Sequence, residues 1–283
     1  MTSLHMISSA IEAGDIEVGI AGGVEDMFTI PQGGFAPDFN VKLAEQDYYI
    51  SMGEGAELLA DELNISREEQ EEFSFSSHEK AVAAREAGKF DNEIVPITLE
   101  DGTIIDQDSG PRNPDKEKIK SLNPAFRADG TVTAATSSPF SIGASAMLIT
   151  SENFANKHGL KIRAFIEGRA VAGVNWKMFG SGPVPATKKA LEKTGLSIDD
   201  IDALELNEAF AAQALYCIKK ANWNPDKVNL NGGAVALGHP LGISGTRIIT
   251  TLLNVLEQND KNTGLATMCV GTGQGITTII KRG

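Results

Sequence analysis

A glycine-rich loop between residues 232 and 245 is the feature that most restricts the folds open to this chain. The loop contains five glycines and leads directly into an apolar helical pattern that starts at Thr246. Glycine has no Cβ, so the backbone here can approach a ligand closely. The loop delivers that ligand to a helix N-terminus, where free N–H groups and the positive end of the helix dipole favour negative charge. This pattern predicts a site for an anion or oxyanion, with His239 inside the loop itself.

Composition excludes several classes of protein. The 283 residues include 25 Lys and Arg against 38 Asp and Glu, a net charge of -13. This balance argues against nucleic acid as the main partner, because no basic field covers the surface. No apolar run approaches the ~20 residues of a membrane span. The two cysteines, Cys217 and Cys269, lack the spacing of a metal site or a disulfide framework, so we expect no metal and a reduced, cytoplasmic setting.

Strand and helix patterns alternate near both ends of the chain but not in its middle third. Such alternation predicts a layered α/β core. Between the alternating parts, capped helices and loops broken by Gly and Pro predict a separate α-rich layer. We therefore expect the end of a first core half at residues 1–26, an inserted loop domain at 27–137, a return to the first half at 138–160 and a second half at 161–283.

The two core halves show a weak internal repeat. A helix, a strand and a Gly-Gly pair over residues 4–23 match a helix, a strand and Gly-Thr-Gly over residues 247–273. Two similar stacked halves would produce such a match. The chain also begins within a helical pattern, with no strand before it. That start indicates either an incomplete first half or a fold that simply opens on a helix.

Cys269 lies near the end of a buried strand predicted over residues 265–270, and glycines follow it. Active sites of open α/β sheets gather at strand ends of this kind. A nearby imidazole or helix N-terminus can lower the thiol pKa from about 8.5, which would let the group act as an acid or a base. The alternative is a small apolar core residue, a common fate of a free cysteine.

Two further motifs follow strands in the same half. His239 can activate a thiol or donate to an oxyanion, or it can simply cap a turn. Asn207 opens an Asn-Glu-Ala-Phe motif after the strand at 203–206, where it can orient a water or an oxygen or cap the next helix. The other histidines are expected on solvated helix surfaces; they are His5, His78 and His158.

In this order, the Asn-Glu-Ala-Phe, Gly-His-Pro and Cys-x-Gly-x-Gly-x-Gly motifs resemble those of the thiolase family, which includes acetyl-CoA acetyltransferases and 3-ketoacyl-CoA thiolases. The resemblance extends over nearly the whole chain, through phrases at residues 12–25, 51–53, 65–70, 90–96 and 182–185. It implies an α/β fold of layered α-β-α-β-α type, made of two similar halves with an inserted α-rich loop domain. The first half would be incomplete.

The resemblance also implies a reaction. Thiolases make or cleave a carbon–carbon bond between two acyl units carried on coenzyme A. They do so by thiolytic cleavage of a 3-ketoacyl-CoA or by Claisen condensation of acyl-CoA units, through a cysteine thioester. Coenzyme A and acyl-CoA are then the substrates and partners, and no cofactor is implied. The family forms dimers and tetramers, which implies a homodimer or homotetramer for the full-length protein.

Site roles follow from the same resemblance. His239 matches the histidine that activates the nucleophile and helps to bind the thioester oxygen, and Cys269 matches the acid/base cysteine. Asn207 matches the residue that holds a water in the first oxyanion hole, and Gly271 matches the backbone donor of the second. The implied substrate-binding positions are Ser138, near the pantetheine arm of CoA, and Met52.

One family residue has no match in this chain. The nucleophilic cysteine heads the helix with which the chain begins, and it would lie a few residues before Met1. Cys217 is expected within a helix and cannot replace it. The resemblance therefore predicts a truncated chain that is inactive as given. The alternative is a non-catalytic thiolase-like partner or an acyl-CoA-binding subunit.

Overall fold

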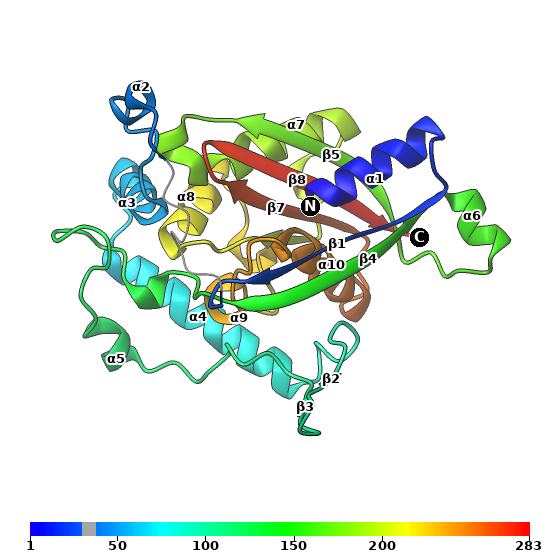
Figure 1. Cartoon of the computed structure of the whole chain (residues 1–283), viewed down its shortest axis with the longest axis horizontal. Coiled ribbons are helices and arrows are strands. Elements are labelled where there is room, and N and C mark those ends of the chain that lie inside the picture. Colours follow the sequence, from blue (N-terminus) through cyan, green and yellow to red (C-terminus); the bar gives the residue numbers. More distant parts are fainter. Residues whose placement is uncertain (30–37) are drawn as a thin grey trace.

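A four-stranded mixed sheet forms the centre of the computed structural model, which describes residues 1–29 and 38–283 (Figure 1). Its strands are β5 (Ala164–Gly173), β6 (Ala203–Leu206), β7 (Thr263–Val270) and β8 (Gln274–Arg282). Their order is β5–β8–β7–β6, in which only β7 and β6 run parallel to each other. The two central strands, β7 and β8, are buried on both sides over most of their length, as expected for a sheet covered by helices on both faces.

Helices cover the two faces of this sheet. One face packs against α7 (Pro183–Thr194) and α8 (Ala211–Ala221). The other face packs against α10 (Ser244–Gln258), and α1 (Thr2–Ala13) shares the same apolar cluster. Leu252 and Leu256 of α10 are completely buried there. Burial of one such side chain stabilises a fold by about 1.5–3 kcal/mol.

A second sheet lies beyond α1 and α10 (Figure 1). It pairs β1 (Val18–Asp26) with β4 (Ile142–Thr150) in antiparallel register. The described residues thus form four alternating layers of helix and sheet. The order α1, β1, β4 repeats the order α10, β7, β8, each as a helix followed by two antiparallel strands. This structural repeat accounts for the weak internal repeat in the sequence.

The α-rich segment after β1 packs beside the second half of the core, where α4 contacts α8. Its helices begin at side-chain caps: Ser66 and Glu69 form a capping box at the start of α4. Residues 30–37 of the predicted insert lie outside the described residues. The segment contains α2 (Val41–Ala44), α3 (Met52–Leu63), α4 (Arg67–Glu86), β2 (Ile97–Thr98), β3 (Ile104–Ile105), α5 (Lys116–Lys120) and a 3₁₀ turn at Ala134–Thr136.

Short elements complete the chain. They are α6 (Glu152–Lys157), α9 (Ala234–Leu237) and 3₁₀ turns at Trp176–Ser181, Ile198–Asp200 and Pro225–Lys227. Among them α9 matters most for function, because it forms the first part of the glycine-rich loop and ends directly before Gly238 and His239.

Apolar side chains on β1 and β4 lead to a prediction about self-association. Ile20 and Leu148 are cross-strand partners, 70% and 55% exposed, and exposed apolar strands promote association. The double change Ile20→Lys with Leu148→Glu should therefore reduce self-association measured by sedimentation velocity. The free energy of unfolding should change by less than ~0.5 kcal/mol, as for surface substitutions. Ile104→Lys, at a 60% exposed residue of β3, should have little effect, and an equal effect would contradict the prediction.

Candidate active site

Two neighbouring strands bring Asn207 and Cys269 to one edge of the central sheet. Leu206 pairs with Thr267 where β6 runs parallel to β7, so the carboxyl ends of both strands meet there. The N–H of Asn207 continues this pairing and donates to the carbonyl of Thr267 at 3.0 Å. Asn207 is fully buried and does not cap α8, whose N-cap is Phe210. Its side chain is therefore available to interact with groups at the carboxyl ends of these strands.

His239 reaches the same place from the glycine-rich loop. Gly238, directly before it, has a φ of 93°, and a Cβ there would lie only 2.4 Å from the Ser141 hydroxyl oxygen. Only glycine fits this position without strain. The Ser141 hydroxyl also accepts a hydrogen bond from the His239 N–H at 3.2 Å. The segment before β4 and the loop before α10 therefore jointly hold the histidine backbone.

Hydrogen bonds on both ring nitrogens orient the imidazole of His239. Nε2 lies 3.3 Å from Nδ2 of Asn207, and Nδ1 lies 2.6 Å from the Ser244 hydroxyl. The Ser244 hydroxyl donates its own proton to the carbonyl of Pro240 at 2.8 Å, so it accepts from Nδ1–H. An amide nitrogen only donates. In this arrangement His239 is neutral, with its proton on Nδ1 and its lone pair on Nε2.

Electrostatics favour the same neutral state. Burial, and to a smaller extent the charge of Arg247, lowers the pKa of His239 to about 4. The other amide atom of the pair, Oδ1 of Asn207, is buried and has no hydrogen-bond partner within the described residues. An acceptor left in this way is suited to bind a water or a polar ligand atom.

The thiol of Cys269 differs from the prediction made for it. The residue is 6% exposed, and burial raises its pKa to about 12. The expectation that a neighbouring imidazole or helix N-terminus would lower this pKa was wrong, because His239 is neutral and desolvation dominates. Cys269 is therefore a protonated thiol at neutral pH, which is suited to give up a proton to a stronger base.

Cys217 lies within α8 and is completely buried. Its sulfur contacts the carbonyl of Gly180 at 3.2 Å and Nε2 of Gln213 at 3.5 Å. Burial raises the pKa of this thiol as well. Because a thiolate is the reactive form of cysteine, Cys217 is poorly placed to accept an acyl group.

The remaining predicted positions lie around the same edge. Gly271 is exposed in the turn between β7 and β8, and a Cβ on it would lie 3.9 Å from the Met52 sulfur. Thr272 beside it has a φ of 66°, which is unusual for a β-branched residue and typical of strained functional loops. Ser138 is half-buried, and its N–H and hydroxyl both donate to the carbonyl of Ala209 at 3.0 Å. Met52 thus lies beside Gly271, and Ser138 lies beside the Asn-Glu-Ala-Phe motif that contains Asn207.

Sequence reasoning missed the polar groups that support the histidine, Ser141 and Ser244. The available signal was that Ser244 follows His239 within the same glycine-rich loop. Two other histidine predictions were wrong. His78 is 3% exposed, and His5 is half-buried and hydrogen-bonded to Thr278 at 2.8 Å. Burial lowers the pKa of each to about 4, whereas His158 is exposed as expected.

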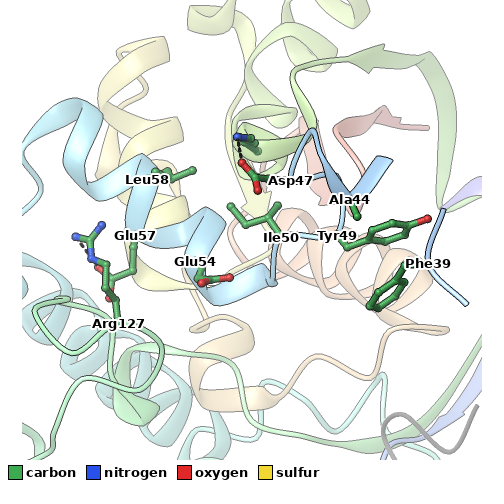
Figure 2. A pocket seen from close by; sticks show the side chains of 10 residues that line it. Phe39, Ala44, Asp47, Tyr49, Ile50, Glu54, Glu57, Leu58 and Arg127 are labelled. Carbon is green, nitrogen blue, oxygen red and sulfur yellow. Dashed lines mark hydrogen bonds and ion pairs between the residues drawn. The ribbon is translucent and has the colours of Figure 1, made fainter. Parts of the chain in front are cut away.

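A separate open pocket of about 520 Å³ lies in the α-rich segment (Figure 2). Asp47 pairs with Lys177 at 2.6 Å on one side, and Arg127 points toward Glu57 on the other. None of the predicted site residues lines it, so size alone does not identify the reactive centre. The lining consists of Phe39, Ala44, Asp47, Tyr49, Ile50, Glu54, Glu57, Leu58, Arg127 and Lys177.

Within residues 1–29 and 38–283, no cluster of three or more His, Cys, Asp or Glu side chains could hold a metal ion. None of the helices in these ranges has the length and apolar character needed to cross a membrane.

Comparison with known families agrees with this geometry. The thiolase N-terminal domain family matches residues 1–153, and the thiolase C-terminal domain family matches residues 160–282. The chain belongs to the thiolase family. It is similar to the proteins named 3-ketoacyl-CoA thiolase of Vibrio parahaemolyticus (50% identical over 294 residues, 100% of this chain and 75% of the relative) and of Serratia proteamaculans (50% over 293 residues, 100% and 76%).

Solved structures show the same relationship. The acetyl-CoA acetyltransferase of Bacillus anthracis matches with a TM-score of 0.92 and 39% identity, over 100% of this chain and 76% of that one. Human mitochondrial 3-ketoacyl-CoA thiolase in complex with CoA matches with a TM-score of 0.91 and 35% identity, over 100% and 75%. The predicted family and α/β thiolase-like fold are therefore confirmed.

Proposed function

We propose that this chain supplies the oxyanion-binding and proton-transfer groups of a thiolase active site. By family it is an acyl-CoA C-acyltransferase. The observation that carries the proposal is the 3.3 Å contact between Asn207 and His239, at the end of the sheet where Cys269 is the penultimate residue of β7. Relatives named 3-ketoacyl-CoA thiolase support a 3-ketoacyl-CoA as the substrate of cleavage. Coenzyme A and acyl-CoA would be the reacting partners, with no further cofactor.

Each group has a task in breaking or forming the bond between the α and β carbons. His239 accepts the proton of an attacking thiol at Nε2, and the resulting imidazolium donates to the thioester oxygen. Asn207 holds a water at the same oxygen. Cys269 gives a proton to the departing α-carbon, or removes one as the thiolate in the condensation direction. The N–H of Gly271 donates to the second oxyanion, since such donors act where negative charge develops.

Acyl transfer also needs a thiol that carries the acyl group. The environments of Cys217 and Cys269 support neither as that acceptor, because burial raises the pKa of both thiols. We therefore propose that this polypeptide alone does not complete thiolysis. The same observation favours the second candidate function, a non-catalytic thiolase-like partner or acyl-CoA-binding subunit.

An assay of CoA-dependent cleavage of acetoacetyl-CoA, paired with calorimetric titration of acetyl-CoA, tests this proposal. We expect binding without thiolytic turnover by this chain. Turnover, together with a stable acyl adduct on either cysteine seen by intact-protein mass spectrometry, would contradict the account of the two thiols. Exchange of the α-protons of bound acetyl-CoA separates the two candidates, since only a catalytic site supports it.

Compartment and assembly follow as further parts of the proposal. Two free cysteines support a reducing, cytoplasmic setting. The exposed apolar residues of β1 and β4 support association into a homodimer or homotetramer. Size-exclusion chromatography with light scattering tests the assembly.

A further inference from the structure

Glu208 follows Asn207 directly in the chain, yet its carboxylate contacts the glycine-rich loop. The residue is 1% exposed. Oε2 accepts hydrogen bonds from the Ser77 hydroxyl at 2.7 Å and from the Val235 N–H at 3.1 Å. Oε1 accepts from Nδ2 of Asn229 at 2.7 Å. One buried carboxylate therefore joins helix α4, Asn229 just before the glycine-rich loop and the first turn of α9.

Ser77 extends this contact to a second backbone group. Its hydroxyl oxygen accepts a hydrogen bond from the Gly233 N–H at 3.1 Å while the hydroxyl proton goes to Glu208. A Cβ on Gly233 would lie 2.2 Å from the carboxylate of Glu208, so the loop backbone rests directly against it. Gly233 is the N-cap of α9, and α9 ends at Leu237, two residues before His239. The two anchored N–H groups thus fix the position of the first turn of α9 and, through this short helix, the position of His239.

The neighbours of this carboxylate favour its ionised form. Asn229 can only donate to it through Nδ2, because Oδ1 of Asn229 already accepts from the Leu206 N–H at 2.8 Å. Burial raises the pKa of Glu208, and the hydrogen bonds from Ser77, Asn229 and Val235 oppose that shift. Three donors converge on the group. A protonated carboxyl would direct its own hydrogen at one of them, which costs a buried hydrogen bond.

We propose that Glu208 is a positioning residue that holds His239 against Asn207 by anchoring the backbone of the glycine-rich loop, with Ser77 as its relay. Glu208 is covalently next to Asn207 and hydrogen-bonded to the loop that carries His239. A single side chain therefore links the backbone segments that carry the two groups. The proposal rests on the proposed function only for what His239 does; the anchor itself can be measured without any catalytic assay.

Amide hydrogen exchange by NMR tests the anchor in the folded chain. Glu208→Ala should increase the exchange rates of the Gly233 and Val235 amides at least tenfold. Ser77→Ala should do so mainly at Gly233. Glu208→Gln should be intermediate, because one oxygen can still accept from Ser77 and Val235 while its amide group faces the donor Asn229.

A second measurement separates positioning from a general loss of structure. The ring signals of His239, titrated with ¹⁵N-labelled histidine, should move from a pKa of about 4 toward 6.5 in Glu208→Ala, with a smaller move in Glu208→Gln. The signals of His5, which is hydrogen-bonded to Thr278 in β8, should keep their pKa of about 4. Global unfolding would shift both histidines together.

Glu57→Ala provides a matched control. Glu57 is also 1% exposed, and it accepts from the backbone N–H groups of Thr131 and Val132 at 2.9 Å. This variant should speed exchange at those two amides and leave Gly233, Val235 and the His239 signals unchanged.

Wild-type exchange at Val235 and unchanged His239 signals in Glu208→Ala would overturn the proposal. If that variant does not fold, Ser77→Ala and Glu208→Gln decide the question by the same criteria. A lack of α-proton exchange in the wild-type chain would count against the proposed function but would leave these measurements unaffected.

Discussion

Replacing Cys269 by alanine should abolish the exchange of acetyl-CoA α-protons with solvent deuterium. General acid–base groups typically contribute about 10²–10⁴-fold, so we expect a rate at least 10²-fold lower than that of the unaltered chain. In the proposed mechanism this thiol, near the end of β7, is the acid/base group, and alanine has no proton to exchange. Deuterium incorporation into acetyl-CoA, followed by mass spectrometry, measures the rate. Cys217→Ala is the matched control and should retain exchange, because Cys217 is completely buried within α8 and, among the described residues, its sulfur forms hydrogen bonds with Gly180 and Gln213.

The pH dependence of the same exchange tests the environment of Cys269. Removal of an α-proton needs the thiolate, and burial raises the pKa of this thiol to about 12. The thiolate is therefore scarce at neutral pH, and its fraction grows about tenfold per pH unit below the pKa. Exchange should rise steadily between pH 7 and 10 without levelling off. A plateau near pH 8.5–9, the range of an ordinary thiol, would show that Cys269 is not the base or is not desolvated.

Removal of the imidazole in His239→Ala should slow α-proton exchange by about 10²-fold, because the amide of Asn207, which would hold the water at the oxyanion, loses its 3.3 Å partner, and one oxyanion-hole group typically contributes about 10²–10³-fold. Ser244→Ala should cost less, about tenfold, because it removes the 2.6 Å partner that orients the ring but leaves the ring itself. The double variant should be no slower than His239→Ala alone, since Ser244 acts through the histidine. Deuterium exchange with acetyl-CoA again provides the measurement.

Two comparisons make the result specific. Ser244→Thr keeps a hydroxyl and should restore most of the rate lost in Ser244→Ala. His158→Ala, at an exposed helix end, should leave exchange unchanged. Additive losses in the double variant would mean that Ser244 contributes independently of His239, contrary to the hydrogen-bond arrangement.

Much of the fold was predictable from local sequence. The alternation of strands and helices and the glycine-rich loop before a helix are short-range patterns, and they led to the α/β class. The order of motifs around Asn207, His239 and Cys269 led to the family. Even the structural repeat, in which α10 and β7 correspond to α1 and β1, was detectable as a weak sequence repeat between residues 4–23 and 247–273. These features are local because backbone geometry and turn chemistry depend on a few neighbouring residues.

Tertiary structure alone decided the chemistry of these residues. Desolvation, which raises the pKa of Cys269 and lowers that of His239, depends on what packs over a side chain from distant segments. The anchor of the glycine-rich loop likewise joins Glu208 to Ser77, 131 positions away in the chain. The sequence by itself determined which groups this protein brings to its site. Their protonation, orientation and support were settled by long-range packing, because burial and hydrogen bonding are properties of the assembled core.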